Sequence, residues 1–157
     1  MSGAYRPATP EDYDALGEVM FHAVWANPSP YTDDERRAWV SAPRIGADWA
    51  ERLAGQMIIV FEEAGQIAGF MSVVPETGYV DFAYTLAAAR GRGVFRELYA
   101  RIETHARENG CAHLTTHASL SAHLAFLAVG FSVVQEEVVE IADQRLRRYE
   151  MAKSLTD

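Results

Sequence analysis

Two periods of hydrophobic and polar positions run through the chain, and each period predicts a type of element. Tyr13, Leu16, Met20 and Val24 recur at helical spacing, which predicts a helix that starts after Thr9 and stops before a proline-rich stretch. A second helical stripe covers 94–106. Apolar, β-branched and aromatic runs at 57–62, 67–74 and 79–86 predict three strands. The turns between these strands are short, which favours an antiparallel meander.

The remaining segments complete a mixed pattern of strands and helices. A short strand is expected at 5–8, and two helices at 33–41 and 47–53 within an irregular segment. Further along, the pattern predicts a strand at 112–117, a helix from Ser119 to Gly130, and closing strands at 131–135 and 138–152 with a turn at Asp143-Gln144. The length of 157 residues suits one domain. Since no linker or repeat divides the sequence, we expect a single α/β domain over 1–157.

A basic glycine turn separates the strand at 79–86 from the helix that follows it. Arg90-Gly-Arg-Gly precedes the helix, whose first N–H groups lack intrahelical partners and carry the positive end of the helix dipole. Glycines allow a phosphate to approach the backbone, and arginines add charge, so this turn suits a pyrophosphate. A tight turn with solvated arginines is the alternative. The sequence lacks a Walker triplet and the third glycine of a dinucleotide fingerprint.

Three motifs in order resemble the GNAT superfamily of N-acetyltransferases. They are Asp81-x-x-Tyr84-Thr85, Arg90-x-x-Gly93 and Gly130-Phe131, and the resemblance extends over almost the whole chain. It implies a mixed, mostly antiparallel sheet of about seven strands flanked by helices, with strands four and five splayed apart. Phe95 departs from the family pattern, which usually has Gly or Ala at this position.

The resemblance also implies that acetyl-CoA is the acyl donor. No metal is expected, because the sequence has a single cysteine and its histidines are separated. The pantetheine arm would pair with the backbone of Ala83, Tyr84 and Thr85, and Ser119 and Phe126 would lie beside it. The pyrophosphate would bind the turn and the first helical residues, which are Arg90, Gly91, Arg92, Gly93, Val94, Phe95 and Arg96.

The usual catalytic side chains of the family are missing here. Phe126 stands where a tyrosine commonly protonates the leaving thiolate, and Leu114 stands where some members carry a glutamate base. Water, Ser119 or Tyr84 could take over from the acid, and a backbone N–H near Tyr84 would stabilise the oxyanion. His117 is the candidate base, unless it is a capping or solvent-facing histidine. The main alternative to an enzyme is an acyl-CoA-binding sensor without turnover.

The acceptor is the least readable part of the reaction. Tyr31 and Trp39 lie in the irregular segment after the first helix, where we expect them to line the acceptor pocket; packing in the core is the alternative for both. The formal net charge of −8 disfavours nucleic-acid binding and mildly favours a cationic acceptor, such as the amine of a small molecule or peptide.

Composition adds several further expectations. No apolar run approaches a membrane span and no leader is recognisable, so a cytoplasmic protein without membrane contact is expected. The single cysteine, Cys111, is expected to be a buried thiol. His113 and His117 would lie about 13 Å apart in a strand, too far to share a metal ion. A monomer and a homodimer both remain open.

Overall fold

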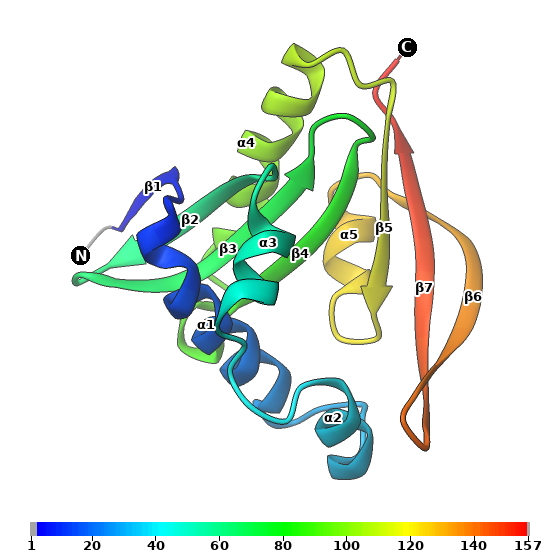
Figure 1. Ribbon diagram of the computed structural model, residues 1–157. Helices are drawn as coiled ribbons and strands as arrows, with labels where there is room; N and C mark the ends of the chain where they lie inside the picture. The colour runs from blue at the N-terminus through cyan, green and yellow to red at the C-terminus, as the bar shows by residue number, and fades with distance from the viewer. Residues whose placement is uncertain (1–2, 157) are drawn as a thin grey trace.

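The protein, described here from a computed structural model that covers residues 3–156, is built on one seven-stranded sheet. The strand order is β1-β2-β3-β4-β5-β7-β6 (Figure 1). The strands are β1 (Ala4–Pro7), β2 (Met57–Glu63), β3 (Gln66–Val74), β4 (Tyr79–Thr85), β5 (His113–Ser119), β6 (Ser132–Ile141) and β7 (Gln144–Ser154). The mixed α/β class and the predicted number of strands are therefore confirmed.

The pairing of β4 with β5 is the exception in this sheet. All other neighbouring strands pair antiparallel, whereas β4 and β5 run parallel and share only the pairs Tyr79↔Thr115 and Val80↔Thr116. Beyond Val80 the two strands diverge, as Figure 1 shows. The splayed strands expected from the family resemblance are thus present.

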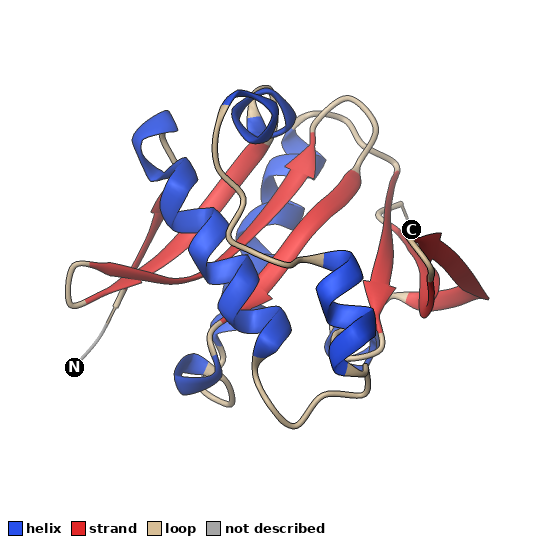
Figure 2. Ribbon diagram, turned by 60° about the horizontal axis from the view of Figure 1, so that its bottom comes forward, coloured by secondary structure: helices blue, strands red, loops and turns tan. Residues whose placement is uncertain are grey.

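Helices cover both faces of the sheet. They are α1 (Tyr13–Trp25), α2 (Asp33–Trp39), α3 (Ala47–Leu53), α4 (Val94–Glu108) and α5 (His123–Ala128). One core joins α1 and α3 to Phe70 and Phe82, while the other joins α4 and α5 to Met71 and Val73. Successive residues of a strand point to opposite faces, so these two cores lie on opposite sides of the sheet. Figure 2 shows α1 lying diagonally across one face of the sheet.

Several boundaries differ from the sequence-based expectation. The helix expected from Ser119 begins only at His123, because Ser119 continues β5 and pairs with Arg148 of β7. The first closing strand was predicted to end at 135, but β6 continues to Ile141 through an irregular register between Val133 and Gln135. The final turn lies at 142–143, one residue earlier than predicted.

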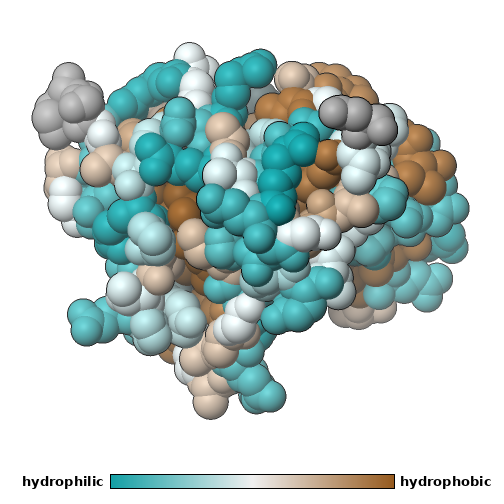
Figure 3. All heavy atoms as spheres, turned by 90° about the horizontal axis from the view of Figure 1, so that it is seen from above, coloured by the Kyte–Doolittle hydropathy of each residue, from teal (hydrophilic) through white to brown (hydrophobic). Residues whose placement is uncertain are grey.

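The outer edge of the sheet carries apolar side chains. Val133, Val134 and Val138 of β6 are exposed, and hydrophobic surface gathers toward this side of the molecule (Figure 3). Within residues 3–156 no helix is long and apolar enough to cross a bilayer.

Candidate functional site

The backbone of β4 has an unpaired edge where it diverges from β5. Leu86 N donates to Ala68 O at 2.8 Å, and hydrogen-bonded pairs alternate along an antiparallel ladder, so Tyr84 directs its own N–H and C=O toward β3. The N–H and C=O groups of Ala83 and Thr85 therefore face the gap toward β5. A ligand lying along this gap would find the donors and acceptors of a sheet edge.

The gap leads to the glycine turn and the start of α4. Gly91 and Gly93 have φ angles of 74° and 80°, which L side chains rarely adopt, and nothing lies within 4 Å of where their Cβ atoms would be. Gly93 is the N-cap of α4 and supplies no side-chain hydrogen bond to the first turn. The N–H groups of Val94, Phe95 and Arg96 therefore lie beside open space that suits a phosphate.

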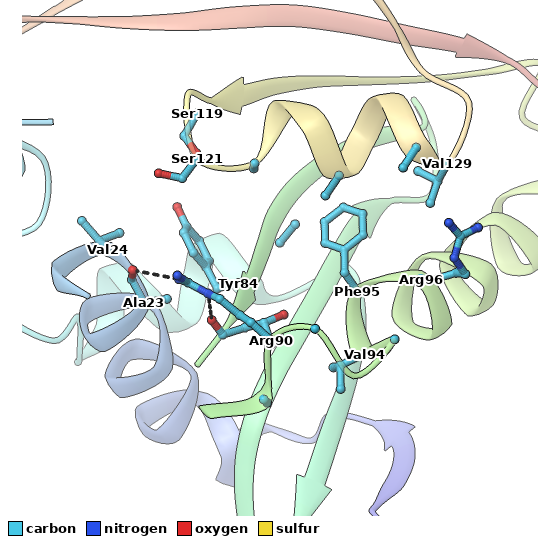
Figure 4. Close-up of a pocket in the computed structure, with 18 of the residues that line it drawn as sticks. Ala23, Val24, Tyr84, Arg90, Val94, Phe95, Arg96, Ser119, Ser121 and Val129 are labelled. Atoms are coloured by element: carbon cyan, nitrogen blue, oxygen red, sulfur yellow. Dashed lines mark hydrogen bonds between the residues drawn. The ribbon is translucent and has the colours of Figure 1, made fainter. Parts of the chain in front are cut away.

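A cavity of about 380 Å³ follows this path from β4 to α4. We call it the gap cavity; its walls come from the ends of α1 and β4, the glycine turn, and the segment from β5 into α5 (Figure 4). The predicted donor-site residues on its wall are Ala83, Tyr84, Thr85, Arg90, Gly91, Gly93, Val94, Phe95, Arg96 and Ser119. Three alanines of the α5 segment, Ala122, Ala125 and Ala128, make the opposite wall apolar.

The three arginines of the turn have different positions. Arg96 lines the gap cavity, and so does Arg90, which donates to the carbonyl oxygens of Thr85 at 3.2 Å and Ala23 at 3.3 Å. Arg92 is not part of the wall; its guanidinium forms two hydrogen bonds to Glu63 of β2, at 3.1 and 2.5 Å. The sequence could not separate Arg92 from its neighbours, because its partner is distant along the chain.

Phe126 lies in the core and is not part of the cavity wall. Its side chain is 2% exposed and packs edge-on against Phe95 and Phe131, with ring centroids 5.1 and 5.0 Å apart. Phe95 fills the space between Phe126 and the gap cavity. The structure thus places Phe126 as a support for the wall, whereas its predicted role was direct contact with the donor.

A second cavity, of about 240 Å³, lies beside the gap cavity. We call it the arginine cavity, because its wall contains Arg44, Arg52, Arg147 and Arg148 together with Asp81. Its apolar lining comes from Met20, Phe82, Val139, Ile141 and Leu146. Sequence reasoning missed all four arginines, which belong to α3, β7 and the segment between α2 and α3.

The two cavities meet at four residues that belong to both walls, namely Tyr31, Trp39, Tyr84 and Ser119. Tyr31 is 7% exposed; its hydroxyl donates to Arg147 O at 2.6 Å and accepts from Leu120 N at 2.9 Å. Trp39 stacks edge-on against Tyr31 with a centroid distance of 5.7 Å. Both predicted pocket residues therefore line a cavity, and Tyr31 is also a structural bridge.

Tyr84 points its hydroxyl into the junction, toward the segment with Ser119 and Ser121 (Figure 4). Burial raises the pKa of this phenol above its usual value of 10.0, so it keeps its proton at neutral pH. Tyr84 can therefore donate a hydrogen bond or a proton at the place where the two cavities meet.

His117 belongs to the wall of the arginine cavity and takes part in a chain of polar groups. The Tyr79 hydroxyl lies 2.8 Å from Nδ1 of His117, and Nε2 of the same ring lies 3.5 Å from a carboxylate oxygen of Glu137. Arg148 donates to that same oxygen at 2.7 Å. Burial, followed by the charge of Asp81, raises the pKa of the Tyr79 phenol. Sequence reasoning found His117 but missed Tyr79, its partner.

The other chemistry-bearing residues lie elsewhere. Leu114 is completely buried in the core beneath α4, and the partly buried Cys111 lies 3.2 Å from the carbonyl oxygen of Pro75. Among residues 3–156 no three His, Cys, Asp or Glu side chains are grouped as metal ligands would be.

Comparison with known proteins identifies the family to which this fold belongs. The family model for the acetyltransferase (GNAT) domain matches residues 28–155. A solved GCN5-related N-acetyltransferase from Rhodopseudomonas palustris is 29% identical, with a TM-score of 0.88 over 99% of this chain and 97% of that one. A comparison with curated protein sequences found no match.

Two more distant structures share the fold and were solved with acetyl-CoA. One is yncA, a putative acetyltransferase from Salmonella typhimurium, at 23% identity and a TM-score of 0.69 over 100% of this chain and 96% of that one. The other is a phosphinothricin acetyltransferase from Sinorhizobium meliloti, at 18% identity and a TM-score of 0.74 over 99% and 89%. The fold, the splayed strands and the glycine turn thus define an acyltransferase scaffold. Since the family model covers most of the chain, this protein belongs to the GNAT acetyltransferase family.

Proposed function

We propose that this protein is an acetyl-CoA-dependent N-acetyltransferase that acts on the primary amine of a small molecule. The observation that supports this most directly is the meeting of two different cavities at Tyr84. One runs along the unpaired edge of β4 to the start of α4, and the other is smaller and lined by ionisable groups as well as apolar side chains. A donor and an acceptor bound in them would have their reacting ends side by side.

The residues of the gap cavity fit acetyl-CoA. Ala83 and Thr85 offer backbone hydrogen bonds to an amide-containing arm, and the alanines of the α5 segment leave width for it. Gly91 and Gly93 expose the backbone beside the α4 N-terminus, where Arg96 adds positive charge for a pyrophosphate. When bound, acetyl-CoA supplies an acetyl thioester, whose carbonyl carbon the neutral amine attacks.

The backbone of β4 and Tyr84 would act on the thioester end. The N–H groups of Ala83 and Thr85 face the gap, so one of them stabilises the negative charge that develops on the carbonyl oxygen. Tyr84 then protonates the departing thiolate. Its raised pKa keeps the hydroxyl protonated until that step and makes it a weaker acid than a phenol with the usual pKa of 10.0.

On the acceptor side, His117 would receive the proton that the amine loses. An alkyl amine has a pKa of about 10.4 if lysine is the guide, so most of it is protonated at neutral pH and a proton acceptor is needed. Tyr79 lies on the same cavity wall and is hydrogen-bonded to Nδ1 of His117, so it can pass the proton to that ring. Glu137 on the far side of the ring stabilises the imidazolium that results.

The direct test is to incubate the purified protein with acetyl-CoA and a panel of primary amines. Release of free thiol, together with mass-spectrometric detection of the acetylated amine, is the expected result. His117→Gln and Tyr84→Phe should each lower kcat about 10²- to 10⁴-fold, as the loss of a positioned acid or base typically does. Acetyl-CoA affinity should stay close to that of the wild type in His117→Gln, because His117 lies on the wall of the arginine cavity alone.

The sensor alternative makes a different prediction in the same experiment. A module that only binds acyl-CoA would show a raised melting temperature with acetyl-CoA, by mass action, and no thiol release with any amine. That result would overturn the proposed enzyme. If acetyl-CoA neither raises the melting temperature nor reacts, both proposals are refuted.

A further inference from the structure

Arg44 is a half-buried cation on the wall of the arginine cavity. Its guanidinium has one hydrogen bond within residues 3–156, to Trp39 O at 3.5 Å, the long limit of such a contact. The guanidinium also lies over the ring of Trp49, whose centroid is 5.9 Å from the guanidinium carbon. A guanidinium has five N–H donors, so most of those on Arg44 are available to a ligand.

The other three arginines of this cavity differ from Arg44, because each of them has a carboxylate partner. Arg52 binds Asp81 through two hydrogen bonds of 3.2 and 2.9 Å. Arg148 binds Glu137 at 2.7 Å, and Arg147 lies 3.8 Å from Glu136. No carboxylate among residues 3–156 forms an ion pair with Arg44, so within these residues it is the one arginine of the cavity wall without a carboxylate in contact.

The backbone of Arg44 is held tightly against α1. Gly17 is a buried residue of that helix, and a Cβ atom added there would lie only 2.0 Å from Arg44 O. A glycine inside a helix is less favourable than alanine, so this close approach is a feature that the fold maintains at some cost. The contact fixes the place from which the Arg44 side chain enters the cavity.

We infer that the acceptor is a small amino acid, whose carboxylate pairs with Arg44 while its amine faces the junction at Tyr84. This inference rests on the proposed function and narrows it to one class of acceptor. A single arginine without a carboxylate in contact calls for a single negative charge, and the planar guanidinium fork matches a carboxylate in two parallel hydrogen bonds. The overall charge of −8 favours a cationic acceptor, but the charge within the cavity favours an acceptor that also carries an anion.

Size and charge support this class over the alternatives. The cavity volume of about 240 Å³ corresponds to about eight water molecules at roughly 30 Å³ each, which is the scale of an amino acid. Burial is the first cause that lowers the pKa of Arg44, and the neighbouring charge of Arg52 is the second; the negative charge of a bound carboxylate would offset both. A purely cationic amine would instead add a positive charge beside Arg44 and Arg52, on a wall whose one carboxylate, Asp81, is already paired with Arg52.

The test compares matched acceptors that differ only at the carboxylate. Leucine, leucinamide and isopentylamine form one such set, and methionine with methioninamide forms a second. Converting the acid to the amide lowers the pKa of the amine and leaves more of it neutral, so intrinsic reactivity favours the amide. A preference for the acid would therefore come from the protein. We expect the acid to have a kcat/KM about 10- to 100-fold above that of its amide, the effect of a charge-assisted hydrogen bond pair.

Variants of Arg44 connect this preference to the residue. Arg44→Gln should abolish most of the discrimination between acid and amide, mainly by raising KM for the acid, and should leave acetyl-CoA affinity unchanged. Arg44→Lys keeps the charge but loses the fork, so it should retain part of the preference. Arg37→Gln is the matched control, because Arg37 pairs with Asp34 on the exposed side of α2 and lines neither cavity. Should Arg44→Gln fail to fold, the partial loss of the preference expected in Arg44→Lys provides the comparison.

A binding measurement separates failure of this inference from failure of the proposed function. The acetylated product N-acetylleucine should bind the protein in the presence of coenzyme A more tightly than N-acetylleucinamide, and Arg44→Gln should remove the difference. If N-acetylleucine binds more tightly than its amide only when Arg44 is present, while no acceptor is turned over, Arg44 is an anion site and the enzyme proposal fails. If amides and simple amines react as well as the acids, or Arg44→Gln leaves the discrimination intact, the inference is wrong although the enzyme proposal stands.

Discussion

Removing the hydroxyl of Tyr31 tests the structural bridge at the junction of the two cavities. This hydroxyl donates to Arg147 O of β7 and accepts from Leu120 N, which follows β5. It thereby connects the loop after α1 to two segments on the other side of the gap. Tyr31→Phe keeps the ring, its packing on Trp39 and its shape, so the loss of two hydrogen bonds is the whole perturbation.

The expected cost follows from the burial of the groups involved. A typical hydrogen bond contributes about 1 kcal/mol net, and a buried partner left unsatisfied costs up to about 3 kcal/mol. Leu120 is half-buried and Arg147 is exposed, so water can reach part of the vacated site. We therefore expect a loss of about 1 to 3 kcal/mol in total, or about 2 to 10 °C in melting temperature for a domain of this size.

Thermal unfolding with and without acetyl-CoA, followed by acceptor kinetics, measures this effect. The loop at Leu120 borders both cavities, so the variant should also weaken acetyl-CoA binding and raise the acceptor KM by a few fold. Tyr13→Phe is the control, because no hydrogen bond to the Tyr13 hydroxyl is found within residues 3–156. A melting temperature of Tyr31→Phe that equals that of Tyr13→Phe would show that the bridge contributes nothing and would refute the reasoning.

Three other substitutions test separate parts of the structure. Gly93→Asp combines a φ of 80° with a carboxylate beside the proposed pyrophosphate site; it should weaken acetyl-CoA binding at least tenfold by calorimetry, and unchanged affinity in a folded variant would contradict the placement of that turn. Phe126→Tyr places a hydroxyl in an aromatic core that is 2% exposed, so we expect a loss of about 1 to 3 kcal/mol and no gain in kcat; a faster enzyme would show that the hydroxyl reaches the donor. Glu103→Gln should remove part of the acid sensitivity of folding. Burial opposes the shift, but hydrogen bonds from Lys153, Tyr99 and Arg107 lower the pKa of Glu103 from 4.5 to about 2. The ionised carboxylate therefore contributes about 3 kcal/mol to the stability of the fold. This contribution is complete above pH 4.5 and disappears as the pH falls toward 2. Equal loss of stability between pH 5 and pH 3 in wild type and variant would refute this assignment.

Much of the fold could be predicted because it depends on local pattern. The strands of the meander and the helices at 33–39 and 47–53 follow from hydrophobic runs, capping residues and breakers that act over a few residues. The glycine turn could be predicted for the same reason, since Gly91 and Gly93 are needed for the backbone conformation at their own positions. The residues of the donor side thus come from one continuous stretch, 83–96, apart from the wall that the α5 segment supplies.

Only the tertiary structure decided which side chains share a cavity. Ser119 was predicted to start a helix, but its pairing with Arg148 of β7 keeps it in a strand, and that partner is 29 residues away. Arg90 and Arg92 look equivalent in sequence, yet Glu63 of a distant strand draws one of them away from the gap cavity.

The acceptor side shows the same limit more fully. Arg44, Arg52 and the neighbouring pair Arg147 and Arg148 come from three distant parts of the chain, so no sequence pattern unites them. Gly17, a glycine within a helix, indicates that another segment packs closely against α1, but the sequence does not show that this segment contains Arg44. Local propensity acts between near neighbours along the chain, whereas a binding cavity is formed by residues that only the packing of the sheet and its helices brings together.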